Sequence, residues 1–191
     1  MTRKPDRRQF LVAAALVGGA VLTWAAPSVA QDKAQPPALV TSIGQSLDAF
    51  QVQLAVKRSG IPYKYDPHIE ANQLGEAKTL MLAVGASLKG FGDAGISISD
   101  ELARTSHLLD AAKAKGLYVV VLHIGGEDRR DALSNQLIEL AAPRANYLII
   151  RNDSDGDGLF TKISKAGNIP MVVIESAATL KQPLEKLFSG G

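Results

Sequence analysis

Five short segments of the sequence combine small residues with side chains that could hold a ligand, and each follows an apolar run. They are 42–46 (SIGQS), 85–95 (GASLKGFGDAG), 123–130 (HIGGEDRR), 151–158 (RNDSDGDG) and 175–178 (ESAA). Main-chain N–H groups at glycine turns, together with hydroxyl, ammonium and guanidinium groups, bind carboxylate or phosphate. We therefore predict a small-anion site with these candidate contacts: Ser42, Gln45, Ser46, Ser87, Lys89, His123, Gly125, Gly126 and Arg129.

The segment 123–130 raises the question of whether its turn binds a ligand or only reverses the chain. Its two acids suit the first turn of a helix, whereas Arg129 and Arg130 are disfavoured near the positive end of a helix. Either neighbouring acids offset these cations, or Gly125 and Gly126 expose amides while one arginine holds an anion. The sequence leaves both interpretations open.

Ser46 lies at a strand-to-helix turn, where a nucleophile elbow would place its serine. The pattern G-x-S-x-G is incomplete because position 48 is Asp, so a helix N-cap is the favoured role of Ser46. His68, His107 and His123 show no metal-ligand spacing. We predict no catalytic residue, and a hydrolase or transferase using Ser46 or His123 is kept as an alternative.

Two further stretches resemble known binding motifs. Residues 90–95 match G-x-G-x-x-G, but they do not directly follow a strand, so we expect a flexible flap, or else a lid over an anion. Asp153, Asp155 and Asp157 match the opening of a calcium loop, but Ser164 stands where a glutamate ligand belongs. We interpret this stretch as an acidic turn, keep its aspartates as weak metal candidates, and predict no cofactor.

The elements that position these segments alternate between strands and helices. Strands are expected at 38–43, 61–66, 78–85, 117–124, 146–152 and 169–176, and helices at 45–60, 99–116, 127–145, 158–168 and 180–188. Several strands are apolar throughout, which indicates burial on both faces. The predicted fold is α/β, a single doubly wound, mostly parallel sheet in a flavodoxin-like or Rossmann-like three-layer sandwich, with a flavodoxin-like strand order.

Two details of the helices follow from the same pattern. Leu47, Phe50 and Leu54 are expected on one apolar face of the helix at 45–60. Ser99 is expected to cap the helix at 99–116, and Gly116 to end it. In a doubly wound sheet, ligands bind beyond the carboxyl ends of the strands. The segments 42–46, 85–95 and 123–130 are therefore predicted to converge on one crevice, with their amide hydrogens pointing into it.

The N-terminal residues resemble an export signal. Arg7 and Arg8 precede an apolar run, and small residues stand at positions 28 and 30, as in a twin-arginine signal cleaved after Ala30. An uncleaved membrane anchor is the alternative. We expect a signal peptide at 1–30, a linker at 31–38, and a single α/β domain at 39–191 in the periplasm.

Composition narrows the function classes. The chain has no cysteine, which excludes disulfides and thiolate chemistry. Basic and acidic residues nearly balance once the expected signal is removed, so no basic surface indicates nucleic acid. No second apolar run is long enough to predict a membrane span in the mature chain.

Several of these stretches resemble an exported bacterial family of unknown function, domain of unknown function 6305. The similar stretches are TSIGQS, IPYKYDP, AKTLMLAVGASLKGFGDAGIS, LHIGGEDRR and DGLFTKI…GNIP, within 38–188. The resemblance implies a small periplasmic α/β domain and supplies no reaction or catalytic residues.

These observations favour a non-catalytic periplasmic protein that binds a small anionic solute or assists a membrane transporter. A protein-interaction module that partners a membrane protein is the first alternative. The hydrolase or transferase named above is the second.

Overall fold

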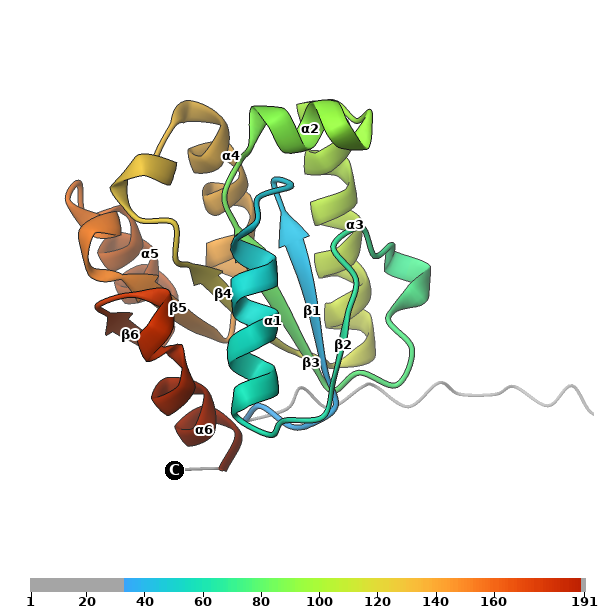
Figure 1. Ribbon diagram of the computed structural model, residues 1–191, viewed down its shortest axis with the longest axis vertical. Helices are drawn as coiled ribbons and strands as arrows, with labels where there is room; N and C mark the ends of the chain where they lie inside the picture. Colours follow the sequence, from blue (N-terminus) through green and yellow to red (C-terminus); the bar gives the residue numbers. More distant parts are fainter. Residues whose placement is uncertain (1–32, 190–191) are drawn as a thin grey trace, which may run out of the picture.

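Six parallel strands form one sheet in a computed structural model of the protein, which describes residues 33–189 (Figure 1). The strands are β1 (Ala38–Ile43), β2 (Tyr63–Tyr65), β3 (Thr79–Val84), β4 (Tyr118–His123), β5 (Tyr147–Arg151) and β6 (Met171–Ile174), in the order β2-β1-β3-β4-β5-β6. This arrangement confirms the predicted doubly wound α/β fold and its flavodoxin-like strand order. The expected signal peptide lies outside the described residues.

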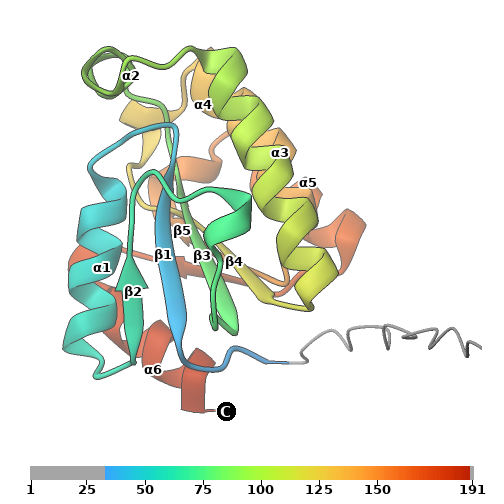
Figure 2. The same cartoon turned by 90° about the vertical axis from the view of Figure 1, so that its right-hand side faces the viewer.

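Helices cover both faces of the sheet (Figures 1 and 2). The helices α1 (Asp48–Arg58) and α6 (Lys181–Ser189) pack on one face, and α3 (Ile98–Lys115), α4 (Ala132–Ala141) and α5 (Leu159–Gly167) pack on the other. Short 3-10 turns lie at η1 (Ala71–Gln73), η2 (Glu127–Arg129), η3 (Ala142–Arg144), η4 (Asn152–Asp155) and η5 (Ala177–Leu180). None of the helices between residues 33 and 189 is long and apolar enough to cross a membrane.

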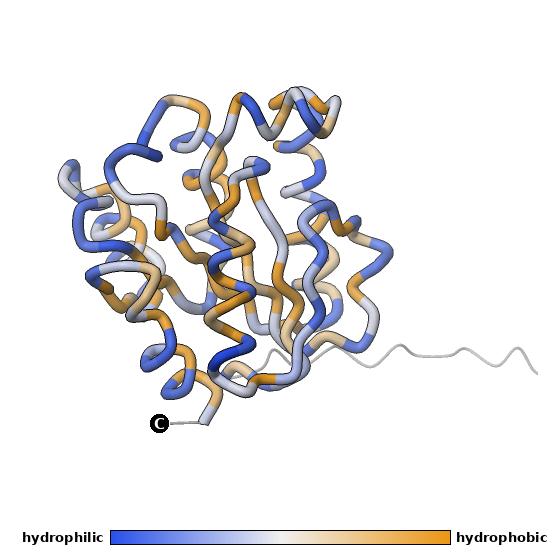
Figure 3. Tube along the Cα trace, in the orientation of Figure 1, coloured by the Kyte–Doolittle hydropathy of each residue, from blue (hydrophilic) through white to orange (hydrophobic). Residues whose placement is uncertain are grey.

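Alternating strand residues supply two separate cores. Leu80 and Val119 belong to the core under α3, α4 and α5, whereas Met81 and Val120 belong to the core under α1 and α6. Successive side chains of a strand point to opposite faces, so a sheet covered on both faces needs apolar residues at every position. Figure 3 shows this as apolar colouring along the central strands.

Residues 85–95 differ from the predicted flexible flap, because Leu88–Ala94 forms the helix α2. The Ser87 hydroxyl accepts a hydrogen bond from the N–H of Gly90, 3.1 Å away, and Gly95 ends the helix in the left-handed conformation. A short helix with two internal glycines has a weak intrinsic tendency to form. Local capping and packing against the β1–α1 turn therefore override its composition.

The helix boundaries differ from the prediction in two other places. Ser97, not Ser99, caps α3, in a reciprocal pair of hydrogen bonds with Asp100. The helix expected over 127–145 is interrupted, because η2 is followed by a new start at Asp131, whose carboxylate accepts from the N–H of Ser134 at 2.7 Å. The first N–H groups of a helix have no main-chain acceptor within the helix, and the carboxylate of Asp131 supplies one at this new start.

The apolar face predicted for α1 is also wrong. Leu47 is 78% exposed and Phe50 is 48% exposed, whereas Ala49, Val52 and Val56 face the sheet. Ala49, Val52 and Val56 follow the i, i+3, i+7 spacing of one helix face. The larger apolar residues at the start of α1 are consequently left on the surface.

Candidate functional site

The three glycine-bearing turns lie against one another at the carboxyl ends of the strands. The N–H of Ser87 donates to the carbonyl oxygen of Gly44 at 2.8 Å, and a Cβ on Gly44 would lie 2.4 Å from the oxygen of Gly85. A Cβ on Gly125 would lie 2.8 Å from the Oδ2 atom of Asp48. Since β2 and β3 lie on either side of β1, the turns after β1 and β3 meet at the switch point of the sheet, where doubly wound proteins bind ligands.

Side chains fill the centre of that convergence. The aliphatic part of Arg129 packs against Gly125, and its Nη1 atom donates to the carbonyl oxygen of Ala86 at 3.0 Å. The guanidinium of Arg151 lies over Gly126, where a Cβ would be only 2.0 Å from Nη2. Gly125 and Gly126 are therefore covered by arginine side chains, and the open space lies closer to β1 and β2.

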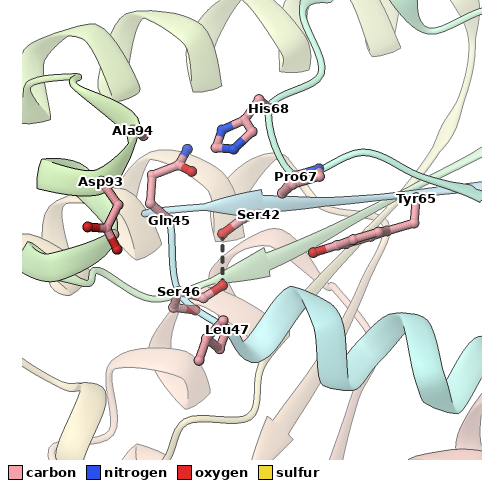
Figure 4. Close-up of a pocket in the computed structure, with 10 residues that line it drawn as sticks. Ser42, Gln45, Ser46, Leu47, Tyr65, Pro67, His68, Asp93 and Ala94 are labelled. Carbon is pink, nitrogen blue, oxygen red and sulfur yellow. Dashed lines mark hydrogen bonds between the residues drawn. The ribbon is translucent and has the colours of Figure 1, made fainter.

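A pocket of about 240 Å³ opens at the carboxyl end of β1, between the β1–α1 turn, the end of β2 and α2 (Figure 4). Its lining residues are Ser42, Gln45, Ser46, Leu47, Tyr65, Pro67, His68, Gly90, Asp93 and Ala94. The structure brings three of the predicted contacts together here, namely Ser42, Gln45 and Ser46. Sequence reasoning did not select Tyr65, His68 or Asp93.

A buried ion pair on α3 fixes the backbone of the β1–α1 turn. Glu101 is fully buried and accepts from the N–H of Gly44 at 2.7 Å. The amide of Gln45 donates to both carboxylate oxygens of Glu101 at 3.2 Å. The Nε and Nη2 atoms of Arg104 lie 2.9 and 2.8 Å from the same carboxylate, and Nη2 also donates to the carbonyl oxygen of Ser42. A buried charge pair with these additional hydrogen bonds specifies one geometry of the turn.

The same ion pair also holds the opposite wall of the pocket. Arg104 Nη1 donates at 2.9 Å to the carbonyl oxygen of Ile69, next to His68. Gln45 adopts a positive φ of 58°, which is uncommon for a residue with a side chain and persists only where the surroundings enforce it. Gly90 packs directly on it, since a Cβ there would lie 2.0 Å from the oxygen of Gln45. Contacts from α3 and from α2 therefore hold both walls of the pocket in place.

Among the lining groups, the hydroxyls of Ser46 and Tyr65 can donate hydrogen bonds to a ligand, whereas the proton of Ser42 is already donated within the β1–α1 turn. The Ser42 hydroxyl donates to the carbonyl oxygen of Ser46 at 3.3 Å, and the Ser46 hydroxyl accepts from the N–H of Asp48 at 3.3 Å, at the start of α1. Burial, with a smaller contribution from the charge of Asp66, raises the pKa of Tyr65, so its hydroxyl stays protonated. The start of α1 adds the positive end of a helix dipole.

The charged residues of α2 lie at or outside the rim. Asp93 is the one carboxylate among the lining residues, its side chain is 71% exposed, and it pairs with Lys89 at 3.6 Å. The Lys89 side chain is 89% exposed, and the Ser87 hydroxyl is used to cap α2. Neither Lys89 nor Ser87 lines the pocket.

His123 lies at the end of β4 and is fully buried. Its Nδ1 atom is 2.8 Å from the carbonyl oxygen of Val84, its Nε2 atom is 3.4 Å from that of Gly126, and its ring packs 5.4 Å from Phe160. Burial lowers the pKa of His123, and the hydrogen bonds to Val84 and Gly126 offset this only in part. A neutral imidazole committed to main-chain oxygens is not positioned as a base for Ser46.

The aspartates of the acidic turn face different partners. Asp155 accepts from the N–H of Phe160 at 2.8 Å and so caps α5. Asp153 pairs with Arg151, and Asp157 with Arg130 at 2.7 Å; these hydrogen bonds lower the pKa of both aspartates. No group of three or more His, Asp or Glu that could hold a metal ion occurs within residues 33–189.

The contacts of Arg129 and Arg130 also bear on the question raised by the segment 123–130. Arg130 pairs with Asp157 and lies 5.3 Å over the ring of Phe160, and Arg129 donates to a main-chain oxygen. Arg130 therefore has an acidic partner, as in the first interpretation, although this acid is distant in sequence; Arg129 contacts a main-chain oxygen and pairs with no acid among the described residues. The turn connects β4 to α4 and packs against the switch point.

These features define a doubly wound parallel α/β domain with a small polar pocket at its switch point. Residues 35–188 match the family described as domain of unknown function DUF6305, so the chain belongs to this family. No curated protein matches the chain. A solved structure with similarity is a GDSL-like lipase from Bacteroides thetaiotaomicron, with 14% identity over 73% of this chain and 71% of that chain, and a TM-score of 0.36. A likeness at that score carries no argument about activity.

Proposed function

We propose that the protein is a non-catalytic binding protein for a small carboxylate or phosphate. The observation that carries the proposal is the composition of the pocket at the end of β1. The lining presents the hydroxyls of Ser46 and Tyr65 as free donors, next to the Ser42 hydroxyl, and the one carboxylate among the lining residues is at the rim and paired with a lysine. Hydroxyl donors at the start of a helix suit an anion.

The support around the pocket favours binding over catalysis. Glu101 and Arg104 hold the turn in one conformation, so little ordering free energy is lost when a ligand enters. A volume of about 240 Å³ suits a ligand of a few non-hydrogen atoms. The alternative of a hydrolase or transferase has no base hydrogen-bonded to Ser46 among the described residues, and His123 is used elsewhere.

The first test is a thermal-shift screen of the purified protein with acetate, propionate and inorganic phosphate, followed by calorimetry on any hit. Tyr65→Phe removes one hydroxyl from the pocket and should weaken binding of the hit about five- to tenfold, as expected for one hydrogen bond. Tyr147→Phe is the matched control, because Tyr147 lies outside the pocket. No stabilisation by any of the anions at millimolar concentration would refute the proposal.

We also propose that the protein is exported through the twin-arginine route and acts in the periplasm. The paired Arg7 and Arg8 and the small residues before Gln31 support this. Replacing both arginines by lysine should abolish export, and mass spectrometry of the exported protein should find Gln31 as the first residue. An unprocessed protein that fractionates with membranes would instead indicate an anchor.

Exposed apolar side chains near the pocket support a second candidate, an interaction module that partners a membrane protein. Leu47 and Leu88 are 78% and 76% exposed, and Phe50 is 48% exposed. Photo-crosslinking from position 88 in intact cells should capture a membrane protein if this candidate is correct. Position 162, on the far helix α5, is the control.

A further inference from the structure

Asp48, the first residue of α1, carries a carboxylate with no partner. Its side chain is buried, with the residue only 5% exposed, and its Oδ2 atom has no hydrogen-bond partner among the described residues. None of the ion pairs within residues 33–189 includes it. Burial of a carboxylate oxygen without a hydrogen-bond partner opposes folding. By contrast, Glu101, the other buried acid, is fully hydrogen-bonded.

The free oxygen of Asp48 lies at the convergence of the three turns. It is 3.3 Å from the position that a Cβ would take on Gly85, and 2.8 Å from that position on Gly125. Glycine at both places leaves the room that this oxygen occupies. The two glycines therefore leave space for the carboxylate at the switch point, and no group there donates a hydrogen bond to its Oδ2 atom.

Asp48 does not line the pocket, but its free oxygen lies close to the pocket residue Ser46. The Oγ atom of Ser46, which lines the pocket, lies 3.7 Å from the same Cβ position on Gly85. The Cβ position on Gly85, just after β3, is thus within 4 Å of both Ser46 in the pocket wall and the free oxygen of Asp48. The aliphatic part of Arg129 lies at the same point, with its Cβ atom 3.9 Å away, and the side-chain hydrogen bond of Arg129 is to Ala86.

We propose that Asp48 receives the protonated amine of the ligand, and that the ligand is a small amino acid. The inference rests on the proposed function, since the hydroxyl-lined pocket would hold the carboxylate of the same molecule. Rotation of Arg129 away from Gly125 admits the amine, which then donates to Oδ2 of Asp48. An ammonium supplies the charge-assisted hydrogen bond that the Oδ2 atom lacks.

The test compares matched probes that differ only by an amine, glycine against acetate and β-alanine against propionate. Calorimetry on the wild-type protein should give at least about tenfold tighter binding of the amino compound of one pair, as expected for a charge-assisted hydrogen bond. Asp48→Asn should reduce that preference, the ratio of the two affinities within a pair, to about twofold. Asp93→Asn is the control at the pocket rim and should keep the preference.

A second readout does not require a ligand. Removing an unpaired buried charge should leave the melting temperature of Asp48→Asn equal to or above that of the wild type. Equal or weaker binding of both amino compounds relative to acetate and propionate overturns the inference but leaves the proposed function standing. A preference that survives in Asp48→Asn, or is lost in Asp93→Asn, also overturns it. Failure of all four probes overturns the inference, and failure of inorganic phosphate as well refutes the proposed function itself.

Discussion

The two halves of the strand-end surface use their charged residues in opposite ways. Near β4 and β5, Arg130 pairs with Asp157 and Arg151 with Asp153, and His123 contacts main-chain oxygens. Near β1 and β3, Glu101 and Arg104 are paired behind the surface, Asp93 is paired with Lys89 at the rim, and the neutral hydroxyls of Ser46 and Tyr65 face the pocket. The half with more charged residues has fewer groups available to a ligand. What identifies a binding surface is unused hydrogen-bonding capacity and not the number of polar residues.

The largest effect is expected from breaking the buried ion pair between Glu101 and Arg104, which holds the β1–α1 turn. Arg104→Ala leaves Glu101 as an uncompensated buried charge, so the free energy of unfolding should fall by about 3–5 kcal/mol. Urea denaturation measures this. Lys89→Ala, which removes an exposed ion pair, is the control and should cost less than about 1 kcal/mol. Similar small losses in both variants would mean that the turn does not depend on the buried pair.

Two glycines of α2 should respond oppositely to the same substitution. Gly90→Ala places a Cβ 2.0 Å from the oxygen of Gln45 and should destabilise the protein by about 1–3 kcal/mol. Gly92→Ala meets nothing within 4 Å and should stabilise it by about 0.5–1 kcal/mol through helix propensity. Melting temperatures of the two variants test the packing of α2 on the pocket. Stabilisation by both would show that α2 does not contact the turn closely.

The β4 half should make stability sensitive to acid. Burial lowers the pKa of His123 below its ordinary value of about 6.5, so below that pH the unfolded chain binds a proton that the folded protein does not. Stability is therefore retained above about pH 6.5 and falls below it, by up to about 1.4 kcal/mol per pH unit until the folded pKa is reached. Urea denaturation at several pH values measures the slope. His123→Gln should flatten it, whereas His107→Gln, at an exposed position, should not.

The smallest effect is expected for the exposed pairs of the acidic turn. Asp157→Asn removes the partner of Arg130 at a position whose side chain is 58% exposed, and should cost at most about 1 kcal/mol. Millimolar calcium should leave the melting temperature of the wild type unchanged, because the aspartates of this turn are engaged by arginines and by a helix start. If calcium raised the melting temperature of the wild type but not of Asp157→Asn, the acidic turn near β5 would have groups available to a ligand, contrary to the comparison above.

The fold was predictable because it depends on composition along short segments. Runs such as LMLAV in β3 are apolar at every position, and this pattern is typical of a sheet covered on both faces. The apolar face of α1 was not predictable, since both Leu47 and Val52 suit a buried helix stripe and only the packing chooses between them. Similarly, α2 depends on its contact with Gln45, which is distant in sequence.

The candidate site was predicted only in the segment around Ser46. Tyr65 and His68 follow the second strand, and the rule that ligands bind beyond strand ends would have indicated them. The sequence gives only a weak indication of Glu101 and Arg104. They are an acid and a base three residues apart, in a helix whose first turns contain several other polar residues. Their role depends on the main-chain groups of another element. Sequence patterns do not report such long-range hydrogen bonds.

Because all strands of the sheet run in the same direction, the pocket lies at the end of the molecule opposite to the two ends of the described chain. Residue 33 lies before the first residue of β1, and Ser189 ends α6 at the same pole of the molecule, whereas the pocket opens at the opposite pole (Figures 1 and 2). A tag, a fluorophore or a sensor chip joined near either of these two residues therefore leaves the mouth of the pocket facing the solution. Immobilisation at either end should accordingly leave the pocket accessible to solutes.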